Sequence, residues 1–369
     1  MYKITEKILI AGSNTTQVSK SLKEKGYIVY ATSYFNNVDQ RKYTDKLITP
    51  TKKQITKEYN PELIETLAKE YTNEVDRIIC LAGVRPWKLP KNKIIGNKNT
   101  EKIDDKYKQY QKLKKDFQIP ETHKLNSIQE AKEISKNFPK KKYITKPIQG
   151  CGGVNIKWLE NTLEQEKPFL LQEYVNGTPL SSSLLRTPNN NTCVITTSQQ
   201  IIGSQKLGQH PFGYCGNITP SIQETKKITN ISKKIAETYK LIGSNGVDFV
   251  LDDNKLYLIE VNPRIQGTIE CIENSYNINL PEAHIDACSN KIVTIPEPNQ
   301  FSIKLILFAK QNLVYKHVNL EGIQDIPPEN MKIQKGEPIL SVVTSDKILE
   351  NAMNKAENIQ RQIYFNLER

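Results

Sequence analysis

Alternating apolar and polar positions predict a β-hairpin in the second half of the chain. Two apolar runs, 247–251 and 256–261, flank a turn at 252–254 that is built from Asp, Asp and Asn. Side chains on a strand alternate between its two faces. Glu260 and Asn262 should therefore share one face of the second strand.

Oxygen-bearing side chains gather on this predicted face. Asp248, on the partner strand, joins Glu260 and Asn262 there if the turn holds three or five residues. Two carboxylates and an amide oxygen suit Mg²⁺ or Mn²⁺, which bind oxygen ligands and bridge to phosphates. Arg264 follows, after Pro263 ends the strand. The alternative is that both carboxylates are ordinary solvated strand charges, which the E-x-N-P-R spacing and the upstream motifs disfavour.

A glycine-rich loop follows the predicted strand at 143–146. Gly150, Gly152 and Gly153 lie in the pattern K-P-x-x-G-x-G-G, where missing Cβ atoms let backbone N–H groups approach an anion. Lys146 supplies a fixed cation beside them. No helix with G-K-[ST] follows, so this is not a Walker loop. A plain hairpin turn is the alternative, but the preceding Lys-Pro favours a phosphate cradle.

Helical and extended patterns surround this loop. Residues 100–117 carry apolar side chains at spacings of three and four, which predicts a helix with one buried stripe and Lys106 at its edge. A second helix is expected at 127–137. The segment 169–177 is a strand that runs into a turn, with Gln172 and Glu173 at its polar end and the backbone of Val175 free for contacts.

The first 95 or so residues predict a small α/β unit. Strands at 7–12, 27–31 and 77–81 alternate with helices at 16–25 and 61–71. There is no G-x-G-x-x-G, so a dinucleotide site is not supported. The loop tips Ser13 to Thr15 and Gly83 to Arg85 are where a ligand would lie in such a sheet.

The rest of the chain is a β-rich mixture. A glycine- and aromatic-containing loop is expected at 209–219 and a helix at 221–241. From residue 301 the texture changes, with strands at 302–309 and 339–343 and a terminal helix from Asp346.

Composition excludes some classes of protein. No apolar run approaches the roughly 20 residues of a membrane span. Six cysteines without a C-x-x-C pair argue against a zinc ribbon or a disulfide framework and favour a cytoplasmic location. The net charge of +12 invites a nucleic-acid interpretation. The lysines are spread over the whole length, however, so specific nucleic-acid binding is not expected.

Four motifs in this order resemble those of ATP-grasp proteins: the lysine helix, K-P-x-x-G-x-G-G, Q-E-Y-V-x-G, and D-F-V followed by E-V-N-P-R. The resemblance covers roughly residues 96–290. It is closest to predicted archaeal ATP-dependent carboligases related to biotin carboxylase. It implies an α/β (α+β) ATP-grasp fold with a Rossmann-like pre-ATP-grasp domain at 1–95, an ATP-grasp domain at 96–290 and a C-terminal β-rich segment at 300–369. A glycine-rich lid is implied at about 120–175.

The resemblance also implies roles for single residues. ATP would be bound by two lysines, three glycines and the 172–175 segment: Lys106, Lys146, Gly150, Gly152, Gly153, Gln172, Glu173 and Val175. Mg²⁺ would be held by Asp248, Glu260 and Asn262, although a common ligand in the family at the first position is the longer Glu. Arg264 and Lys146 would be catalytic, with Arg264 stabilising charge on the transferred group.

The implied activity is that of an ATP-dependent ligase, which activates a carboxylate as an acyl phosphate for attack by an amine. Substrate residues are expected just beyond the phosphates, at Arg85, Tyr214, Asn217 and Glu270. A carboxylase or a small-molecule kinase is an alternative, and a non-catalytic ATP-binding regulatory protein is another. The motifs imply small-molecule partners and are compatible with a homodimer. No A-M-K-M-like biotin-acceptor motif is present, which argues against a self-contained biotin carboxylase.

Overall fold

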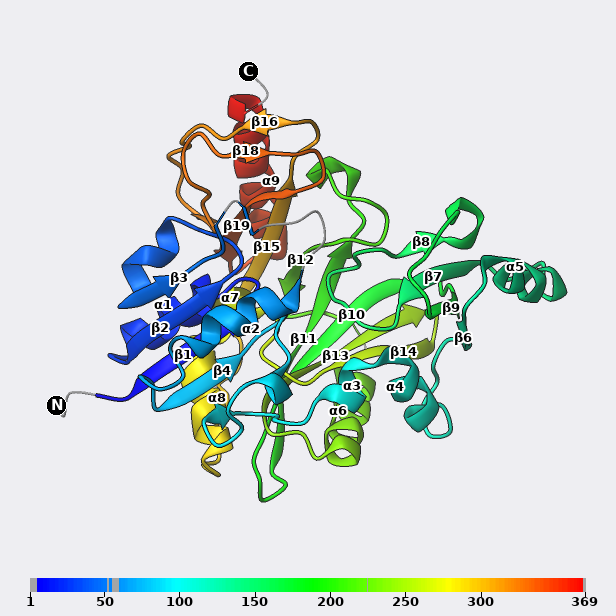
Figure 1. Cartoon of the computed structure of the whole chain (residues 1–369), viewed down its shortest axis with the longest axis horizontal. Coiled ribbons are helices and arrows are strands. Elements are labelled where there is room, and N and C mark those ends of the chain that lie inside the picture. The colour runs from blue at the N-terminus through cyan, green and yellow to red at the C-terminus, as the bar shows by residue number, and fades with distance from the viewer. Residues whose placement is uncertain (1–4, 52, 55–59, 224, 368–369) are drawn as a thin grey trace.

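Four β-sheets, one of them only two-stranded, and the helices around them make up the computed structural model, which describes residues 5–51, 53–54, 60–223 and 225–367. The N-terminal sheet lies on one side of a large central sheet, and a small four-stranded sheet projects on the other (Figure 1). The C-terminal helix lies at the end of the central sheet that is away from the small one.

The N-terminal unit is a parallel five-stranded sheet of order β3-β2-β1-β4-β5. Alternate residues of β1 face opposite sides. Ile8 packs with Val18 of α1, and Leu9 packs with Ile64 of α2, so one helix covers each face. The predicted β-α-β opening is confirmed. Its elements are β1 (Lys7–Gly12), α1 (Thr16–Glu24), β2 (Ile28–Ser33), β3 (Lys46–Ile48), α2 (Pro61–Lys69), β4 (Arg77–Cys80) and β5 (Ile94–Ile95), with 3-10 turns at Asp39–Tyr43 and Pro86–Lys88.

A helical connection leads to the four-stranded antiparallel sheet, of order β6-β9-β7-β8. Ala131 of α5 packs on Phe169 and Leu171 of this sheet. The glycine-rich loop joins β7 to β8, and this sheet with α5 is called the lid below because it spans the residues predicted to form one. Its elements and the preceding connection are α3 (Glu101–Asp104), α4 (Lys106–Leu113), β6 (Thr122–Leu125), α5 (Ile128–Asn137), β7 (Tyr143–Pro147), β8 (Lys157–Trp158), a 3-10 turn (Leu159–Asn161) and β9 (Phe169–Glu173).

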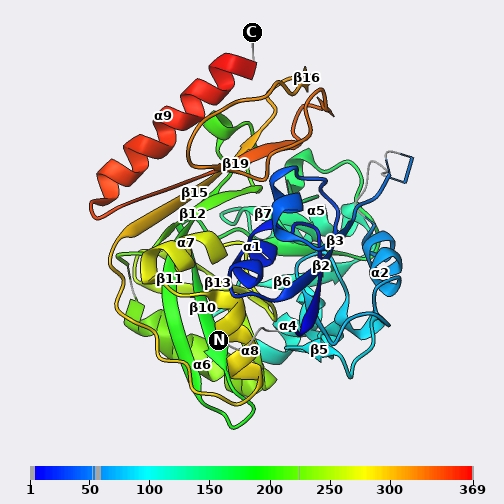
Figure 2. The same cartoon turned by 90° about the vertical axis from the view of Figure 1, so that its left-hand side faces the viewer.

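The central sheet has eight strands in the order β14-β13-β10-β11-β12-β15-β19-β17. Helix α6 covers one face, where Ile235 packs with Leu184 and Phe249. Helices α7 and α8 lie between the other face and the N-terminal unit (Figure 2). The elements are β10 (Thr178–Arg186), β11 (Thr192–Ile202), a 3-10 turn (Gln205–Leu207), β12 (Tyr214–Thr219), α6 (Thr225–Tyr239), β13 (Gly243–Asp252), β14 (Lys255–Asn262), α7 (Ile269–Tyr276) and α8 (Leu280–Cys288).

The C-terminal segment continues this sheet. Strand β15 pairs with β12, and β19 pairs with β15 and β17, while α9 packs on them through Ala356 and Ile363. A two-stranded sheet, β16 with β18, closes the end. The elements are β15 (Phe301–Phe308), β16 (Leu313–Val314), β17 (Ile323–Gln324), β18 (Lys332–Ile333), β19 (Pro338–Asp346) and α9 (Leu349–Leu367).

Three local expectations need correction. The helix expected at 100–117 divides at Asp105, whose carboxylate caps α4 by accepting from the backbone N–H groups of Tyr107 and Lys108. The second half of the expected loop at 209–219 is strand β12, because it pairs on both sides. Strand β10 was not predicted, since its centre is three buried serines and carries no apolar alternation.

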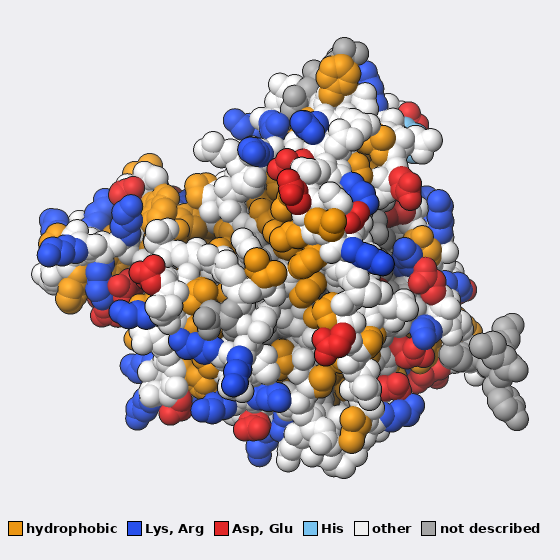
Figure 3. All heavy atoms as spheres, turned by 180° about the vertical axis from the view of Figure 1, so that it is seen from behind, with side chains coloured by type: hydrophobic (Ala, Val, Ile, Leu, Met, Phe, Trp, Pro, Cys, Tyr) orange, Lys and Arg blue, Asp and Glu red, His pale blue; other side chains and the backbone are white. Residues whose placement is uncertain are grey.

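The surface shows no concentration of one charge on the face in Figure 3, where basic side chains are interspersed with acidic ones. Among the helices of the described residues, none has the length and apolar character needed to cross a membrane.

Candidate active site

A β-bulge sets the geometry of the hairpin β13–β14. The strands pair Asp252 with Lys255, so the turn holds two residues and does not meet the condition of three or five residues under which Asp248 was expected on this face. A two-residue turn in unbroken register would pair Asp248 with Ile259. A register shift between Asp248 and Phe249 places Asp248 opposite Glu260 instead. The two carboxylates meet as expected, but through a different local structure.

Polar contacts hold this surface together. Asp248 Oδ2 accepts a hydrogen bond from Asn262 Nδ2 at 2.8 Å, and its Oδ1 accepts from Gln200 Nε2 at 3.1 Å. Glu260 Oε1 lies 3.0 Å from Lys106 Nζ. Gln200 on β11 was missed by sequence reasoning, because nothing along the chain marks β11 as a neighbour of this hairpin through β10.

Two lysines approach Glu260 from the lid side. Lys106 begins α4, and its Nζ also donates to the backbone oxygen of Gly150 at 2.6 Å. Lys146 is only 4% exposed on β7, and its Nζ donates to Gln172 Oε1 at 2.8 Å. The lysines from the two motifs therefore converge beside the carboxylates of the hairpin.

Burial and neighbouring charges shift the pKa values of these groups. Burial lowers the pKa of Lys146 to about 8, helped by Lys106 and opposed by Glu260. Burial and the charge of Glu260 raise the pKa of Asp248 to about 7. Burial also acts to raise the pKa of Glu260, but Lys106 outweighs it with help from Lys146 and Arg264, so the pKa is lowered overall.

The donor set of the hairpin fits a divalent cation. The described residues include no cluster of three or more His, Cys, Asp or Glu. The hairpin offers two carboxylates that repel one another and the side chain of Asn262 beside them. This oxygen set is the kind that Mg²⁺ shares with phosphate oxygens. Asp248, Glu260 and Asn262 are thus the residues that would hold the metal.

The glycine-rich loop packs against the loop before β12. Gly150, Gly152 and Gly153 all have positive φ, at 128°, 67° and 79°. A Cβ atom on Gly153 would lie 1.8 Å from the backbone oxygen of Phe212, so only glycine fits there. The backbone N–H of Tyr214 donates to the oxygen of Gly152 at 3.2 Å. The loop is hydrogen-bonded across to the central sheet.

The 172–175 segment, which was expected to bind ATP, divides between two faces of β9. Gln172 is buried, donates to Thr122 Oγ1 and accepts from Lys146. Glu173 points to the opposite face, where it pairs with Lys141 at 3.1 Å. Val175 lies after the strand. A pocket between α4, the lid strands and β14 is lined by Lys106, Gln109, Tyr110, Leu113, Ile119, Lys146, Gln172, Leu258 and Ile259.

The residues expected to bind substrate separate into two groups. Tyr214 Oη donates to Asn217 Oδ1 at 2.8 Å. Burial raises the pKa of Tyr214, and the charge of the nearby Glu270 adds to the rise. Arg85 has other partners: its guanidinium binds both oxygens of Glu65 at 2.8 Å and Glu62 at 3.2 Å. These contacts give Arg85 a role within the N-terminal unit.

Known proteins resemble this chain in sequence. The model of the ATP-grasp domain matches residues 103–268. An uncharacterised protein of Methanocaldococcus jannaschii is 35% identical over 93% of this chain and 89% of its own length. The tyramine–L-glutamate ligase of the same organism is 31% identical over 45% of this chain and 48% of its own.

Solved structures agree on the fold. The biotin carboxylase domain of Hydrogenobacter thermophilus 2-oxoglutarate carboxylase, solved with MgADP, ADP and bicarbonate, superposes with a TM-score of 0.74 at 17% identity, over 99% of this chain and 91% of that one. N5-carboxyaminoimidazole ribonucleotide synthetase of Thermotoga maritima gives 0.70 at 17% identity, over 97% and 98%. The chain belongs to the ATP-grasp superfamily, as its motifs indicated.

Proposed function

We propose that this protein is an ATP-dependent ligase that activates a small-molecule carboxylate as an acyl phosphate and joins it to an amine. One observation carries the proposal. Two lysines from the lid side, Lys106 and Lys146, converge on two carboxylates of one hairpin, Asp248 and Glu260. Phosphate oxygens and a divalent cation together would satisfy both sets of charges.

Each residue then has a defined task in binding. Lys146 is a buried cation whose hydrogen-bond partner is the neutral Gln172, so a phosphate would supply the anion that it lacks. Lys106 already bridges Glu260 and the glycine-rich loop, and so would link phosphate binding to the position of that loop. A bound Mg²⁺ would supply neutralisation of phosphate charge. Asp248, Glu260 and Asn262 would hold it.

The chemistry needs no protein nucleophile. A carboxylate oxygen of the substrate attacks the γ-phosphorus, the bond to the β-phosphate oxygen breaks, and ADP leaves. The second substrate loses one proton from its ammonium group to become a nucleophilic amine. The amine nitrogen then attacks the acyl carbon, loses a second proton, and expels inorganic phosphate as the amide forms. Arg264, which follows the metal strand, would stabilise negative charge on the transferred phosphoryl group and on the leaving phosphate.

The glycine-rich loop would protect the intermediate. An acyl phosphate hydrolyses if water reaches it, so the site must exclude solvent while the amine binds. Gly150 to Gly153 lie between Lys106 and the loop that carries Phe212. Closure of this segment over the phosphates would be linked directly to nucleotide binding.

The relatives' names support this reaction class. Two of these names describe the joining of two small molecules: tyramine–L-glutamate ligase, and D-alanine–D-alanine ligase from Carboxydothermus hydrogenoformans. The carboxylate and amine of this protein are accordingly proposed to be small metabolites. A cytoplasmic location remains a prediction from the cysteine pattern.

The test is Glu260→Gln, which removes a charged ligand and keeps the side-chain volume. We expect ADP release in the presence of MgATP and pooled carboxylates and amines to fall at least about a hundredfold, because a group that stabilises the transition state is lost. Asp253→Asn is the matched control, since it neutralises an acid at the exposed tip of the same hairpin. It should keep wild-type turnover.

The products distinguish the alternatives. A ligase releases ADP and phosphate only when both a carboxylate and an amine are present, and mass spectrometry should show the amide. A kinase needs one acceptor and releases no phosphate, a carboxylase depends on bicarbonate, and a non-catalytic binder releases neither product. Wild-type turnover in Glu260→Gln would overturn the assignment of the metal site.

A further inference from the structure

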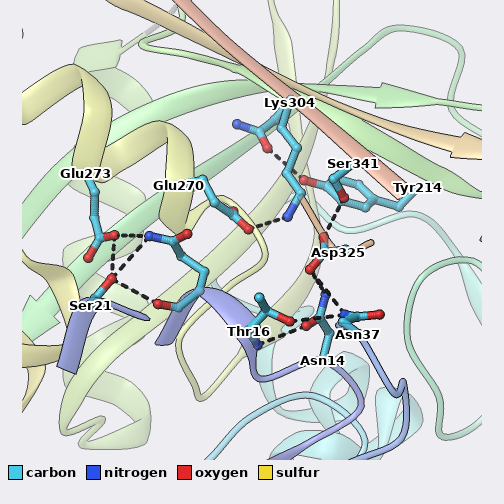
Figure 4. Close-up of polar contacts among 12 residues, drawn as sticks. Asn14, Thr16, Ser21, Asn37, Tyr214, Glu270, Glu273, Lys304, Asp325 and Ser341 are labelled. Atoms are coloured by element: carbon cyan, nitrogen blue, oxygen red, sulfur yellow. Dashed lines mark hydrogen bonds and ion pairs between the residues drawn. The ribbon is translucent and has the colours of Figure 1, made fainter. Parts of the chain in front are cut away.

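A buried polar cluster lies where three parts of the chain meet, and the nucleotide site does not use it (Figure 4). Glu270 lies in the first turn of α7, Lys304 lies in β15, and Asp325 follows β17. Lys304 Nζ donates to Glu270 Oε1 at 2.6 Å. Asp325 Oδ1 accepts from Asn14 Nδ2 at 2.8 Å, which connects the cluster to the loop after β1.

One carboxylate oxygen in this cluster has no partner. Glu270 is 4% exposed, and while its Oε1 binds Lys304, its Oε2 is buried without a hydrogen bond from any described residue. It is the only carboxylate oxygen among the described residues in that condition. A buried charged oxygen left unsatisfied is costly, and a water, an ion or a ligand bound there would satisfy it.

Negative charge exceeds positive charge around Lys304. Burial acts to lower the pKa of Lys304, but Glu270 and Asp325 together raise it overall. Both oxygens of Asp325 are occupied by neutral groups, Asn14 Nδ2 and Ser341 Oγ. Asp39 accepts from the backbone N–H of Asp325 at 2.9 Å and so fixes that segment. Lys304 therefore faces two carboxylates, Glu270 and Asp325, and the cluster favours a further cation.

The cluster adjoins the metal-binding hairpin. Burial raises the pKa of Tyr214, and the charges of Glu270 and Asp248 both add to the rise, so the ring lies near both carboxylates. A Cβ atom on Gly267 would lie 4.0 Å from Tyr214 Cε1, so the ring packs on the segment that leaves β14. That segment also carries Gln266, whose Nε2 is 3.5 Å from Asp248 Oδ1. A ligand at Glu270 would be next to the site where the acyl phosphate forms.

We propose that Glu270 Oε2, with Asp325 behind Lys304, binds the ammonium group of the amine substrate, while the carboxylate substrate lies on the Arg264 side. This inference rests on the proposed function, because it assigns the second substrate of that reaction. Lys304 serves as the positioning residue that fixes the Glu270 carboxylate. A divalent metal ion is a poorer occupant than an ammonium group, because the lysine ammonium 2.6 Å from the same carboxylate repels two positive charges more strongly than one.

Probes matched in shape separate charge from size. The amine probes are ethylamine, tyramine and glycinamide. Each is compared with a neutral analogue of similar shape, an alcohol or an amide, and with an anionic analogue, a carboxylate. Each is added at about 10 mM, chosen to exceed ordinary substrate affinities, and Mg²⁺ alone is a further arm. Thermal stabilisation of the wild-type protein is measured with and without MgATP, followed by ADP release with pooled carboxylates. We expect stabilisation by at least one amine and by none of its neutral or anionic counterparts.

The variants test the residue. Glu270→Gln keeps volume and removes charge, and should raise the apparent KM for the amine about tenfold to a hundredfold, the range expected for a hydrogen bond to a charged group, with the KM for ATP unchanged. Glu273→Gln is the matched control: it lies one turn along α7, and its oxygens are occupied by Gln17, Ser21 and the N–H of Leu280. It should leave the KM for the amine unchanged. If Glu270→Gln fails to fold, Asp325→Asn replaces it, with the same expected direction.

The outcomes distinguish this inference from the proposed function. If MgATP does not stabilise the protein, the proposed function fails, while selective stabilisation by an amine would still support the cation site. If MgATP binds but no amine does, or the carboxylate or neutral counterparts or Mg²⁺ alone bind as well as the amines, the inference fails alone. An equal change in both KM values for Glu270→Gln would make the cluster a structural ion pair and overturn the assignment.

Discussion

Two buried lysines in this protein have opposite surroundings. Lys146 in the lid is 4% exposed, its hydrogen-bond partner is the amide oxygen of Gln172, and burial lowers its pKa to about 8. Lys304 in the central sheet is 5% exposed and touches Glu270, which with Asp325 outweighs burial and raises its pKa. Equal burial therefore gives opposite shifts.

The difference separates a binding group from a structural one. A buried ammonium without a carboxylate partner is held in an unfavourable state, which an incoming phosphate relieves. A buried ammonium that is paired contributes order and becomes costly only when its partner is removed. Lys146 is the lysine suited to bind nucleotide, whereas Lys304 is suited to position Glu270.

The largest expected effect is on stability, from Lys304→Met. Removing the ammonium leaves Glu270 buried and unpaired, so the free energy of unfolding should fall by about 3–5 kcal/mol. The double variant Glu270→Gln, Lys304→Met should recover most of this loss. Urea denaturation of wild type, both single variants and the double variant measures the coupling. A loss below about 1 kcal/mol for Lys304→Met would mean that solvent reaches the pair.

Lys146→Met should act on activity and spare stability. Turnover should fall about a hundredfold to a thousandfold, as for loss of one donor that stabilises transition-state charge. Stability should stay the same or rise, because an unpaired buried cation is replaced by an apolar side chain of similar length. Lys142→Met, on the exposed end of the same strand segment, is the control and should retain turnover. Unchanged turnover in Lys146→Met would show that the unpaired lysine does not bind the transferred phosphate.

Arg85→Ala tests a third cation, which is paired with Glu65 inside the N-terminal unit. Its loss leaves Glu65 buried without the guanidinium, so we expect destabilisation of about 2 kcal/mol. The apparent KM values for the carboxylate substrate and for ATP should change alike. Steady-state kinetics with both substrates checks this. A selective rise for the carboxylate would instead support the role in substrate binding that the sequence suggested.

The smallest effect is on the pH dependence of nucleotide affinity. Bound phosphates favour charged Lys146, so above pH of about 8 binding must take up a proton, and affinity should fall up to about tenfold per pH unit. In the nucleotide-free protein the pKa of Lys146 lies below the ordinary 10.5, so between pH of about 8 and 10.5 the unfolded state binds more protons than the folded state. The contribution of Lys146 to the free energy of unfolding therefore rises with pH over this range. Titration calorimetry in buffers of different ionisation enthalpy measures the proton uptake. Lys146→Met should abolish it.

Local patterns in the sequence predicted the fold class and several of the residues that the fold brings together at the candidate site. The strand alternation placed Glu260 and Asn262 on one surface, and the glycines predicted the loop that joins β7 to β8. The same reasoning missed β10, because its buried serines resemble an exposed segment. It also set a condition on turn length that the structure does not meet, since a bulge changes register without leaving a mark in the hydrophobic pattern.

The sequence by itself determined what each segment forms and which chemical groups it carries, because backbone preference and side-chain alternation act over a few residues. The tertiary structure decided which groups meet. Lys106 reaches Glu260, Arg85 is taken by Glu65, and Glu270 joins Lys304 and Asp325 from distant segments. The electrostatic state of a charged side chain depends on its neighbours and on burial, and both exist only once the sheets have packed.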